Sequence, residues 1–319
     1  MLPNVLSVNN LRTAFGTPSK PVTALRDVSF SIARGTTLAL VGESGSGKSL
    51  TALSIMGLVP PSGFIESGSI RFNDIDLLSL PEQELRSLRG NRMAMIFQEP
   101  MTSLNPVLRL GDQLCEPLML HRGVNRRDAH DEAVLLLESV GIAAAKTRMS
   151  DYPHQLSGGM RQRVIIAMAI ACKPELLIAD EPTTALDVTI QAQILELLDS
   201  LRRQHQMATL LITHDLGIVA ERADQTCVMY AGQIVEQAPT AEIFSAPLLP
   251  YTRALMTALP QNATPGKPIP SLAGQPPSPA DTCPGCRFFE RCPEALPECA
   301  ACIPALEERT PGHFTRCIK

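Results

Sequence analysis

The chain contains the stretch Gly42-Glu43-Ser44-Gly45-Ser46-Gly47-Lys48-Ser49, which fits the phosphate-binding loop pattern GxxxxGK(S/T). The apolar run 38–41 leads into this stretch, and the helix-like run 50–56 follows it. The pattern is specific when a strand precedes the loop and a helix follows it. We therefore predict a buried strand, a phosphate-binding loop and a helix, in this order.

The residue types of this loop suit a nucleotide phosphate. Its three glycines allow backbone turns that a Cβ would block, so that several N–H groups can point at one anion. The following helix adds the positive end of its dipole. We expect Lys48 to reach the β- and γ-phosphates and the Ser49 hydroxyl to bind Mg²⁺. The Lys-Ser pair and both flanks disfavour the alternative, a Gly/Ser-rich surface turn.

Composition and charge restrict the classes of protein. Of the 319 residues, 45% are apolar, which is enough for one large domain with an appendage or for two domains. The net charge of −4 gives no electrostatic argument for nucleic acid. The longest apolar run, 164–172, is half of the ~18 residues that a membrane helix needs. Residues 1–4 lack the start of a signal peptide, so we expect a cytosolic chain that is able to dock on a membrane protein.

Four apolar runs each end at residues suited to phosphate or metal chemistry. The runs are 38–41, 93–97, 176–179 and 209–213, and they end at the phosphate loop, at Gln98, at Asp180 with Glu181, and at His214. Continuous apolar runs of this length are typical of parallel strands buried on both faces. Ligands bind outside the carboxyl ends of such strands. We therefore predict that these residues converge at one edge of a sheet.

Helical patterns separate the apolar runs. Apolar residues at positions 133, 136, 137 and 140 follow the spacing of one helix face, and Gly141 suits the C-cap. A second stripe extends from position 190 to 201. Both stripes are interpreted as core packing. The alternation of strands and helices predicts an α/β fold.

A second anion-binding element is predicted before the apolar helix 164–172. Ser157 is a good N-cap residue, and Gly158 and Gly159 leave the first N–H groups of the helix uncovered. Ser-Gly-Gly before a helix is common, so this signal depends on the other motifs.

Paired acids and one aromatic residue complete the candidate nucleotide contacts. Asp180 suits Mg²⁺, and Glu181 suits the general base that orients the attacking water. Phe15 lies between two short strand patterns, 5–8 and 28–32. Two interpretations of Phe15 are open at this point, stacking on a nucleotide base and packing within a hairpin.

Together, these motifs resemble the nucleotide-binding subunits of ABC transporters. The motifs in order are GESGSGKS at 42–49, Gln98, LSGGM at 156–160, LLIADE at 176–181, Ala185-Leu186-Asp187, and His214. The resemblance covers roughly residues 5–240. It implies a P-loop cassette with a mixed, largely parallel central sheet, an antiparallel β subdomain and an α-helical subdomain, followed by a small Cys-rich segment.

The resemblance also implies a role for each motif residue. Lys48 and the loop residues 42–49 bind the phosphates of ATP, and Phe15 stacks on adenine. Mg²⁺ is organised by Ser49, Gln98 and Asp180. The catalytic residues are Glu181, which polarises water, His214, which contacts the γ-phosphate, and Gln98. Two cassettes enclose two ATP molecules head to tail, with Ser157, Gly158 and Gly159 on the partner's ATP and Asp187 at the seam.

Two segments narrow the resemblance to one branch of the family. Residues 99–106 are similar to a segment of dipeptide/oligopeptide and nickel importers, and residues 242–244 with 250–255 are similar to that branch's extension. The resemblance implies an energy-coupling ATPase for peptide import, at the cytoplasmic face of the membrane. Its implied partners are two permease subunits, an identical or homologous second ATPase, and indirectly an extracytoplasmic binding protein, with no nucleic acid.

Two alternative functions remain open. One is the ATPase of a related importer branch, for nickel or another small solute. The other is a soluble, non-transport ABC ATPase that acts on ribosomes or DNA. Such proteins usually carry two cassettes in one chain, whereas this chain has one set of motifs.

The C-terminal part of the chain has a different composition. Prolines are frequent from position 260, and six cysteines follow position 282, which in a reducing cytosol favours metal binding over disulfides. One candidate zinc set is Cys283, Cys286, Cys299 and Cys302. One candidate iron–sulfur set is Cys286, Cys292, Cys299 and Cys317. Spacing favours zinc slightly, but similarity to the tails of peptide-importer ATPases, some of which carry a 4Fe–4S cluster, favours the cluster; an empty thiol-rich tail is the third interpretation.

These features predict three parts. They are a nucleotide-binding domain at 1–240, a Pro-rich extension at 241–282 and a Cys-rich metal-binding segment at 283–319.

Overall fold

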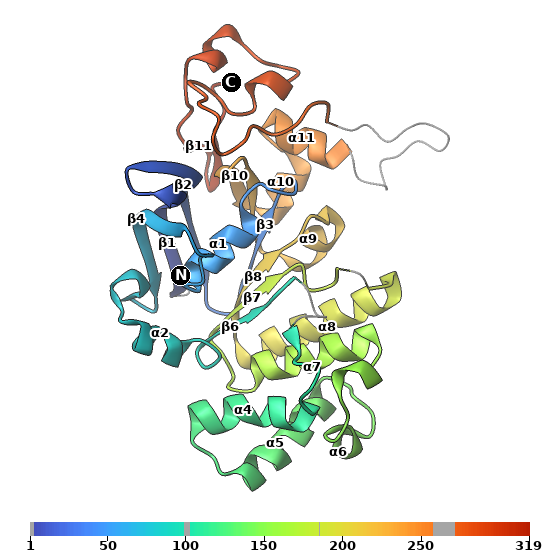
Figure 1. Cartoon of the computed structure of the whole chain (residues 1–319). Helices are drawn as coiled ribbons and strands as arrows, with labels where there is room; N and C mark the ends of the chain where they lie inside the picture. Colours follow the sequence, from blue (N-terminus) through green and yellow to red (C-terminus); the bar gives the residue numbers. More distant parts are fainter. Residues whose placement is uncertain (1–2, 99–102, 185, 258–271) are drawn as a thin grey trace. The chain divides into compact units, whose positions relative to one another are not determined.

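A computed structural model gives the structure of the chain (Figure 1) and describes residues 3–98, 103–184, 186–257 and 272–319. Parts of three predicted features lie outside these residues, namely 99–102 of the importer segment, Ala185, and 258–271 of the Pro-rich extension. The chain forms two compact units. The first consists of Met1–Val5, Ala33–Thr36 and Ser79–Leu210, and the second of Leu6–Ile32, Thr37–Leu78 and Leu211–Lys319.

Two parallel strands run through the first unit. Strands β6 (Met93–Ile96) and β7 (Leu176–Asp180) pair in parallel, with Ile96 opposite Ala179. Strand β7 is buried along its whole length, as is β8 (Ala208–Ile212), which begins in this unit. The helices described in this unit are α2 (Glu82–Leu88), α4 (Leu110–Arg122), α5 (Arg126–Ser139), α6 (Ala145–Arg148), η2 (Pro153–Gln155), α7 (Gly158–Ile170) and α8 (Val188–His205). The predicted strand runs are confirmed here.

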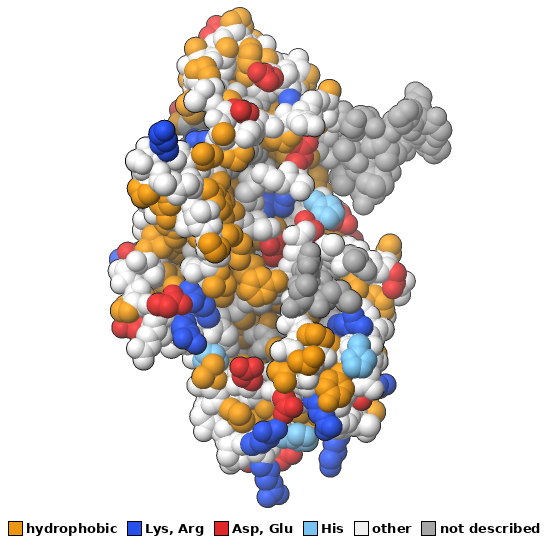
Figure 2. All heavy atoms as spheres, in the orientation of Figure 1, with side chains coloured by type: hydrophobic (Ala, Val, Ile, Leu, Met, Phe, Trp, Pro, Cys, Tyr) orange, Lys and Arg blue, Asp and Glu red, His pale blue; other side chains and the backbone are white. Residues whose placement is uncertain are grey.

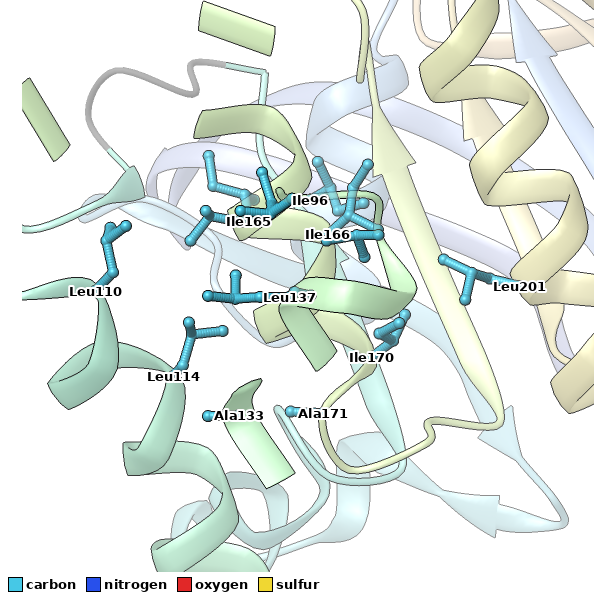
Figure 3. Close-up of a cluster of buried hydrophobic side chains, with 14 of the residues drawn as sticks. Ile96, Leu110, Leu114, Ala133, Leu137, Ile165, Ile166, Ile170, Ala171 and Leu201 are labelled. Carbon is cyan, nitrogen blue, oxygen red and sulfur yellow. The ribbon is translucent and has the colours of Figure 1, made fainter. Parts of the chain in front are cut away.

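One apolar core holds the helices of the first unit together (Figure 3). Helix α5 begins after Asn125, whose side chain accepts hydrogen bonds from two N–H groups of the first turn. It buries Ala129, Ala133 and Leu137, which are spaced four residues apart on one face. Each leucine buried in this way stabilises the fold by about 1.5–3 kcal/mol relative to exposure. The predicted packing role of this stripe is therefore confirmed.

The second unit contains an antiparallel sheet. Its strand order is β2-β1-β4-β5, formed by β1 (Asn4–Thr17), β2 (Lys20–Ala33), β4 (Gly63–Phe72) and β5 (Ile75–Asp76). Strands β1 and β2 are longer than the predicted runs 5–8 and 28–32. In β1 the register to β4 shifts between Asn9 and Thr13, and Asn10 has a φ of 46°. This irregularity breaks the alternation of apolar and polar residues, which is why the pattern predicted only a short strand.

A second set of strands in this unit has the order β11-β12-β10-β9-β3. Strand β3 (Thr37–Val41) pairs in parallel with β9 (Gln225–Tyr230). The remaining strands are β10 (Gln233–Pro239), β11 (Glu307–Thr310) and β12 (His313–Thr315). The pairs β9–β10, β10–β12 and β12–β11 are antiparallel. The helices among the described residues of this unit are η1 (Leu77–Ser79), which ends at the boundary, α1 (Lys48–Ile55), α9 (Leu216–Arg222), α10 (Thr240–Ser245), α11 (Pro250–Thr257), η4 (Phe289–Arg291) and η5 (Pro297–Ala300). Strands β9 to β12 are absent from the sequence-based predictions.

The surface carries both signs of charge. Figure 2 shows acidic and basic side chains on the face in view, with hydrophobic side chains between them. In the first unit, exposed large hydrophobic residues include Val107, Leu108, Leu120 and Leu135. Of the helices that the structure describes, none has both the length and the apolarity to cross a bilayer.

Candidate functional site

The phosphate loop has the predicted context. Strand β3 ends at Val41, and α1 begins at Lys48, one residue after Gly47 with a φ of 108°. Gly42 has a φ of 148°, and a Cβ added there would lie 2.1 Å from the backbone oxygen of Met229 in β9. Only glycine allows both this conformation and this approach. The start of the loop is therefore fixed directly against the neighbouring strand.

Lys48 lies inside the curve of the loop. Its side chain is buried (6% exposed), and its Nζ donates to the backbone oxygens of Gly42 at 2.8 Å and Glu43 at 2.9 Å. A buried ammonium group requires such partners. Ser49 follows in the first turn of α1, at the positive end of the helix dipole. This arrangement places a cation, a hydroxyl and a helix N-terminus around one loop, as an anion site requires.

Phe15 and His214 also belong to the second unit. Phe15 lies in β1 opposite Gly63 of β4, and a Cβ added to Gly63 would lie 2.8 Å from the Phe15 ring. The ring therefore packs across Gly63, although Phe15 is only half-buried. His214 is exposed and precedes Asp215, which caps α9 by accepting from the N–H groups of Gly217 and Ile218.

In the first unit, the structure brings Gln98 and Glu181 together. They follow the paired strands β6 and β7, and Gln98 Nε2 donates to Glu181 Oε2 at 3.1 Å. Thr184 Oγ1 donates to the same oxygen at 2.8 Å, a contact that sequence analysis did not find. Asp180 is the last residue of β7 and is 3% exposed. The amide and the two acids thus lie at the carboxyl ends of neighbouring parallel strands, as the sequence predicts.

Glu181 has an unusual backbone conformation. Its φ is 46°, in the left-handed region that residues other than glycine rarely adopt. Strain of this kind costs about 1–3 kcal/mol and is concentrated at functional sites. The hydrogen bonds from Gln98 and Thr184 hold the carboxylate in one orientation. The geometry suits a base that must present one oxygen to a substrate molecule.

The glycine-rich element and Asp187 both begin helices of the first unit. Ser157 caps α7, and its Oγ accepts from the N–H of Met160 at 3.3 Å, as predicted. A Cβ added to Gly159 would lie 2.8 Å from Ile190 Cγ2, so α7 and α8 approach closely at this point. Asp187 caps α8 by accepting from the N–H of Ile190 at 3.0 Å. Asp187 therefore has a structural role that sequence analysis did not assign.

Four thiols of the C-terminal segment influence one another. Burial raises the pKa of Cys286, and the neighbouring Cys299, Cys292 and Cys317 raise it further. The N–H of Cys286 donates to the oxygen of Cys299 at 2.8 Å, and a Cβ added to Gly285 would lie 2.2 Å from that oxygen. Within the described part of the chain, however, no three or more His, Cys, Asp or Glu side chains form a group that could hold a metal ion.

Comparison with known proteins identifies the family. Residues 25–184, half of the chain, match the family model described as "ABC transporter". The chain belongs to the ABC transporter family. Residues 235–299 match a second model, "Oligopeptide/dipeptide transporter, C-terminal region". The family and the branch that the sequence resembles are both confirmed, and the chain is an ATPase of this family.

Relatives match this ABC family member along nearly its whole length. The Bacillus subtilis protein named "Oligopeptide transport ATP-binding protein AppD" is 51% identical over 98% of this chain and 96% of its own. "Oligopeptide transport ATP-binding protein OppD" of Salmonella typhimurium is 49% identical over 99% and 93%. The solved "Dimeric Structure of MJ0796, a Bacterial ABC Transporter Cassette" is 26% identical, covers 74% of this chain and 98% of its own, and has a TM-score of 0.65. This similarity confirms the predicted P-loop cassette fold.

Proposed function

We propose that the chain is the energy-coupling ATPase of an ABC importer for di- and oligopeptides. The observation that carries the proposal is about 50% identity, over nearly the whole chain, to proteins named as oligopeptide transport ATP-binding proteins. The match of residues 235–299 to the oligopeptide/dipeptide transporter region supports the same assignment.

The contacts within each unit support a division of roles in ATP hydrolysis. The loop 42–49 with Lys48 binds the phosphates, and Glu181, oriented by Gln98 and Thr184, accepts a proton from the attacking water. His214 contacts the γ-phosphate, and Phe15 stacks on adenine. A second cassette supplies Ser157, Gly158 and Gly159 to the same ATP, with Asp187 at the seam. Binding of two ATP molecules then closes the cassette dimer, and hydrolysis opens it.

The donor set also fits Mg²⁺. Ser49, Gln98 and Asp180 provide a hydroxyl, an amide oxygen and a carboxylate, which are the oxygen ligands that Mg²⁺ prefers. When bound, Mg²⁺ neutralises charge on the phosphates of the nucleotide. Lys48 supplies a further positive charge beside the phosphates.

We propose two permease subunits as membrane partners, with the chain peripheral on the cytoplasmic face and a binding protein outside. The second ATPase is either an identical or a homologous subunit. Exposed apolar side chains close to the importer segment support a docking surface there, because Val107 is 75% exposed and Leu108 is exposed beside it. This surface would transmit cassette closure to the permeases.

Val107→Asp is expected to weaken binding of the permeases about tenfold, because a charge would enter an apolar contact. Recovery of the permeases with the tagged chain from detergent-solubilised membranes measures the effect. Leu135→Asp is a matched control, since Leu135 is a similarly exposed residue on α5. Equal recovery with Val107→Asp and the unaltered chain would contradict this docking surface.

Reconstitution tests the function itself. The permeases would be placed in lipid vesicles, with the chain and ATP enclosed and the binding protein outside. Uptake of a labelled tripeptide and of Ni²⁺ into these vesicles would then be measured. We expect ATP-dependent peptide uptake. Nickel uptake without peptide uptake would favour the related importer branch, and sedimentation of the chain with ribosomes instead of permeases would favour the non-transport alternative.

We also propose that residues 283–319 form a Cys-rich segment after a cassette at 1–240 and an extension at 241–282. Cys286, Cys292, Cys299 and Cys317 would hold a 4Fe–4S cluster. Three of them pack against one apolar cluster of the second unit, and the backbone contact between Cys286 and Cys299 and the close approach at Gly285 support this set. The zinc set requires Cys302, which is exposed. Iron and acid-labile sulfide in protein purified without oxygen would support the cluster, whereas zinc or metal-free thiols would refute it.

A further inference from the structure

Arg291 of the C-terminal segment binds a residue of the phosphate loop. It ends η4, and its guanidinium donates to both carboxylate oxygens of Glu43, at 2.7 Å through Nη1 and 2.9 Å through Nη2. The Arg291 side chain is 5% exposed. Bidentate arginine–carboxylate pairs of this geometry are among the strong hydrogen-bonded contacts in proteins. The pair joins positions 248 residues apart, and both lie in the second unit.

An aromatic cluster supports this ion pair and holds the loop at a second point. Arg291 Nη1 also donates to Tyr230 Oη at 3.3 Å, and the guanidinium lies 5.7 Å from the centre of the Tyr230 ring. The rings of Tyr230, Tyr251 and Phe288 pack edge to face. Tyr251 Oη accepts from the backbone N–H of Glu43 at 3.0 Å. The backbone and the side chain of Glu43 are therefore both held by residues outside the loop.

The position of Glu43 makes these contacts relevant to phosphate binding. Its backbone oxygen is one of the acceptors of Lys48 Nζ, so Arg291, Glu43 and Lys48 form a continuous chain of contacts. A carboxylate in a phosphate-binding loop repels the ligand unless a cation neutralises it. Arg291 supplies that charge and also fixes the loop before the ligand arrives, which lowers the entropic cost of binding.

We propose that Arg291 is a positioning residue of the phosphate loop, through which the Cys-rich segment raises the affinity for nucleotide. The inference rests on the proposed role of the loop in phosphate binding. The competing interpretation is that the pair only fastens the C-terminal segment to the cassette. If Arg291 positions the loop, its loss lowers the nucleotide affinity of a folded chain. If the pair only fastens the segment, the affinity of a folded chain does not change.

Titration of the full-length chain with ADP and Mg²⁺, followed by calorimetry, tests the proposal. Arg291→Gln is expected to raise the dissociation constant about tenfold, while kcat at saturating ATP changes less than twofold. Arg287→Gln is the matched control in the same segment, because the Arg287 guanidinium donates to the backbone oxygens of Ser278 and Asp281. Arg291→Lys should give an intermediate constant, since it keeps the charge but loses the bidentate geometry.

A double-mutant cycle shows whether Arg291 acts through Glu43. In the Glu43→Gln background, Arg291→Gln should add no further loss of affinity. Should Arg291→Gln not fold, Arg291→Lys and Tyr251→Phe carry the test, and both should weaken ADP binding severalfold. Wild-type affinity in the folded Arg291 variants, or full additivity in the cycle, would overturn the inference alone. An unaltered chain that does not bind ADP would instead overturn the proposed nucleotide site.

Discussion

Glu181→Gln is expected to lower ATP turnover about 10³-fold, within the 10²–10⁴ range of general acid–base catalysis. The substitution removes the basic oxygen but keeps the shape of the side chain and its ability to accept from Gln98 and Thr184. Binding of Mg²⁺ and ATP should therefore stay within about twofold of the unaltered chain. Phosphate release gives the turnover, and equilibrium titration gives the affinity.

The matched control is Glu196→Gln. Glu196 lies on α8 in the same unit, is exposed and pairs with Arg203, so its loss should not alter turnover. Thr184→Val removes the hydrogen bond from the Thr184 hydroxyl to the Glu181 carboxylate and should lower turnover by an intermediate amount. Turnover above a tenth of the unaltered value in Glu181→Gln would show that another group activates the water.

Glu236→Ala is expected to destabilise the second unit by about 3–5 kcal/mol, because it leaves several hydrogen-bonding groups without their acceptor, and each such buried group costs about 1–3 kcal/mol. Glu236, in β10, accepts from the N–H groups of Leu248 at 2.7 Å and Leu249 at 3.1 Å and from the Thr252 hydroxyl. Its Oε1 also lies 2.7 Å from His313 Nε2 of β12. Without the carboxylate, these four polar groups remain buried without their acceptor.

Hydrogen exchange of the α11 and β12 amides measures this loss locally, which matters because a chain with two units need not unfold in one step. Glu242→Ala is the control, since Glu242 contacts the other ring nitrogen of His313 at 3.6 Å but its side chain is 44% exposed. Its substitution should cost less than about 1 kcal/mol. Equal protection in Glu236→Ala and the unaltered chain would show that the buried pair contributes no stability.

Sequence patterns predicted those parts of the structure whose causes are local. The loop 42–49 requires particular residue types at fixed spacing, and its flanking strand and helix are confirmed. The meeting of Gln98 with Glu181 followed from a general property of parallel strands, although they are 83 residues apart. No sequence pattern indicates the backbone strain at Glu181 or the hydrogen bond from Thr184, so both became known only from the structure.

The contacts that sequence analysis missed depend on distant partners. Strand β12 is three residues long and becomes a strand because β10 pairs with it. From the sequence alone, Arg291 would be taken for a surface arginine of a Cys-rich tail. The residues next to it in the sequence do not indicate that it pairs with a carboxylate 248 residues earlier. Prolines indicated an extended tail but gave no information on where that tail returns to the sheet.

The hairpin of β11 and β12 has a consequence for any shortened form of this ATPase. It covers the outer side of β10, and its own outer strand is short, exposed and charged, with the sequence Glu-Glu-Arg-Thr. Short, charged edge strands of this kind limit pairing between the sheets of different molecules. A chain cut back to residue 240 would present the uncovered backbone groups of β10 to solvent. Its poor solubility would then reflect strand-to-strand aggregation rather than a defect in catalysis.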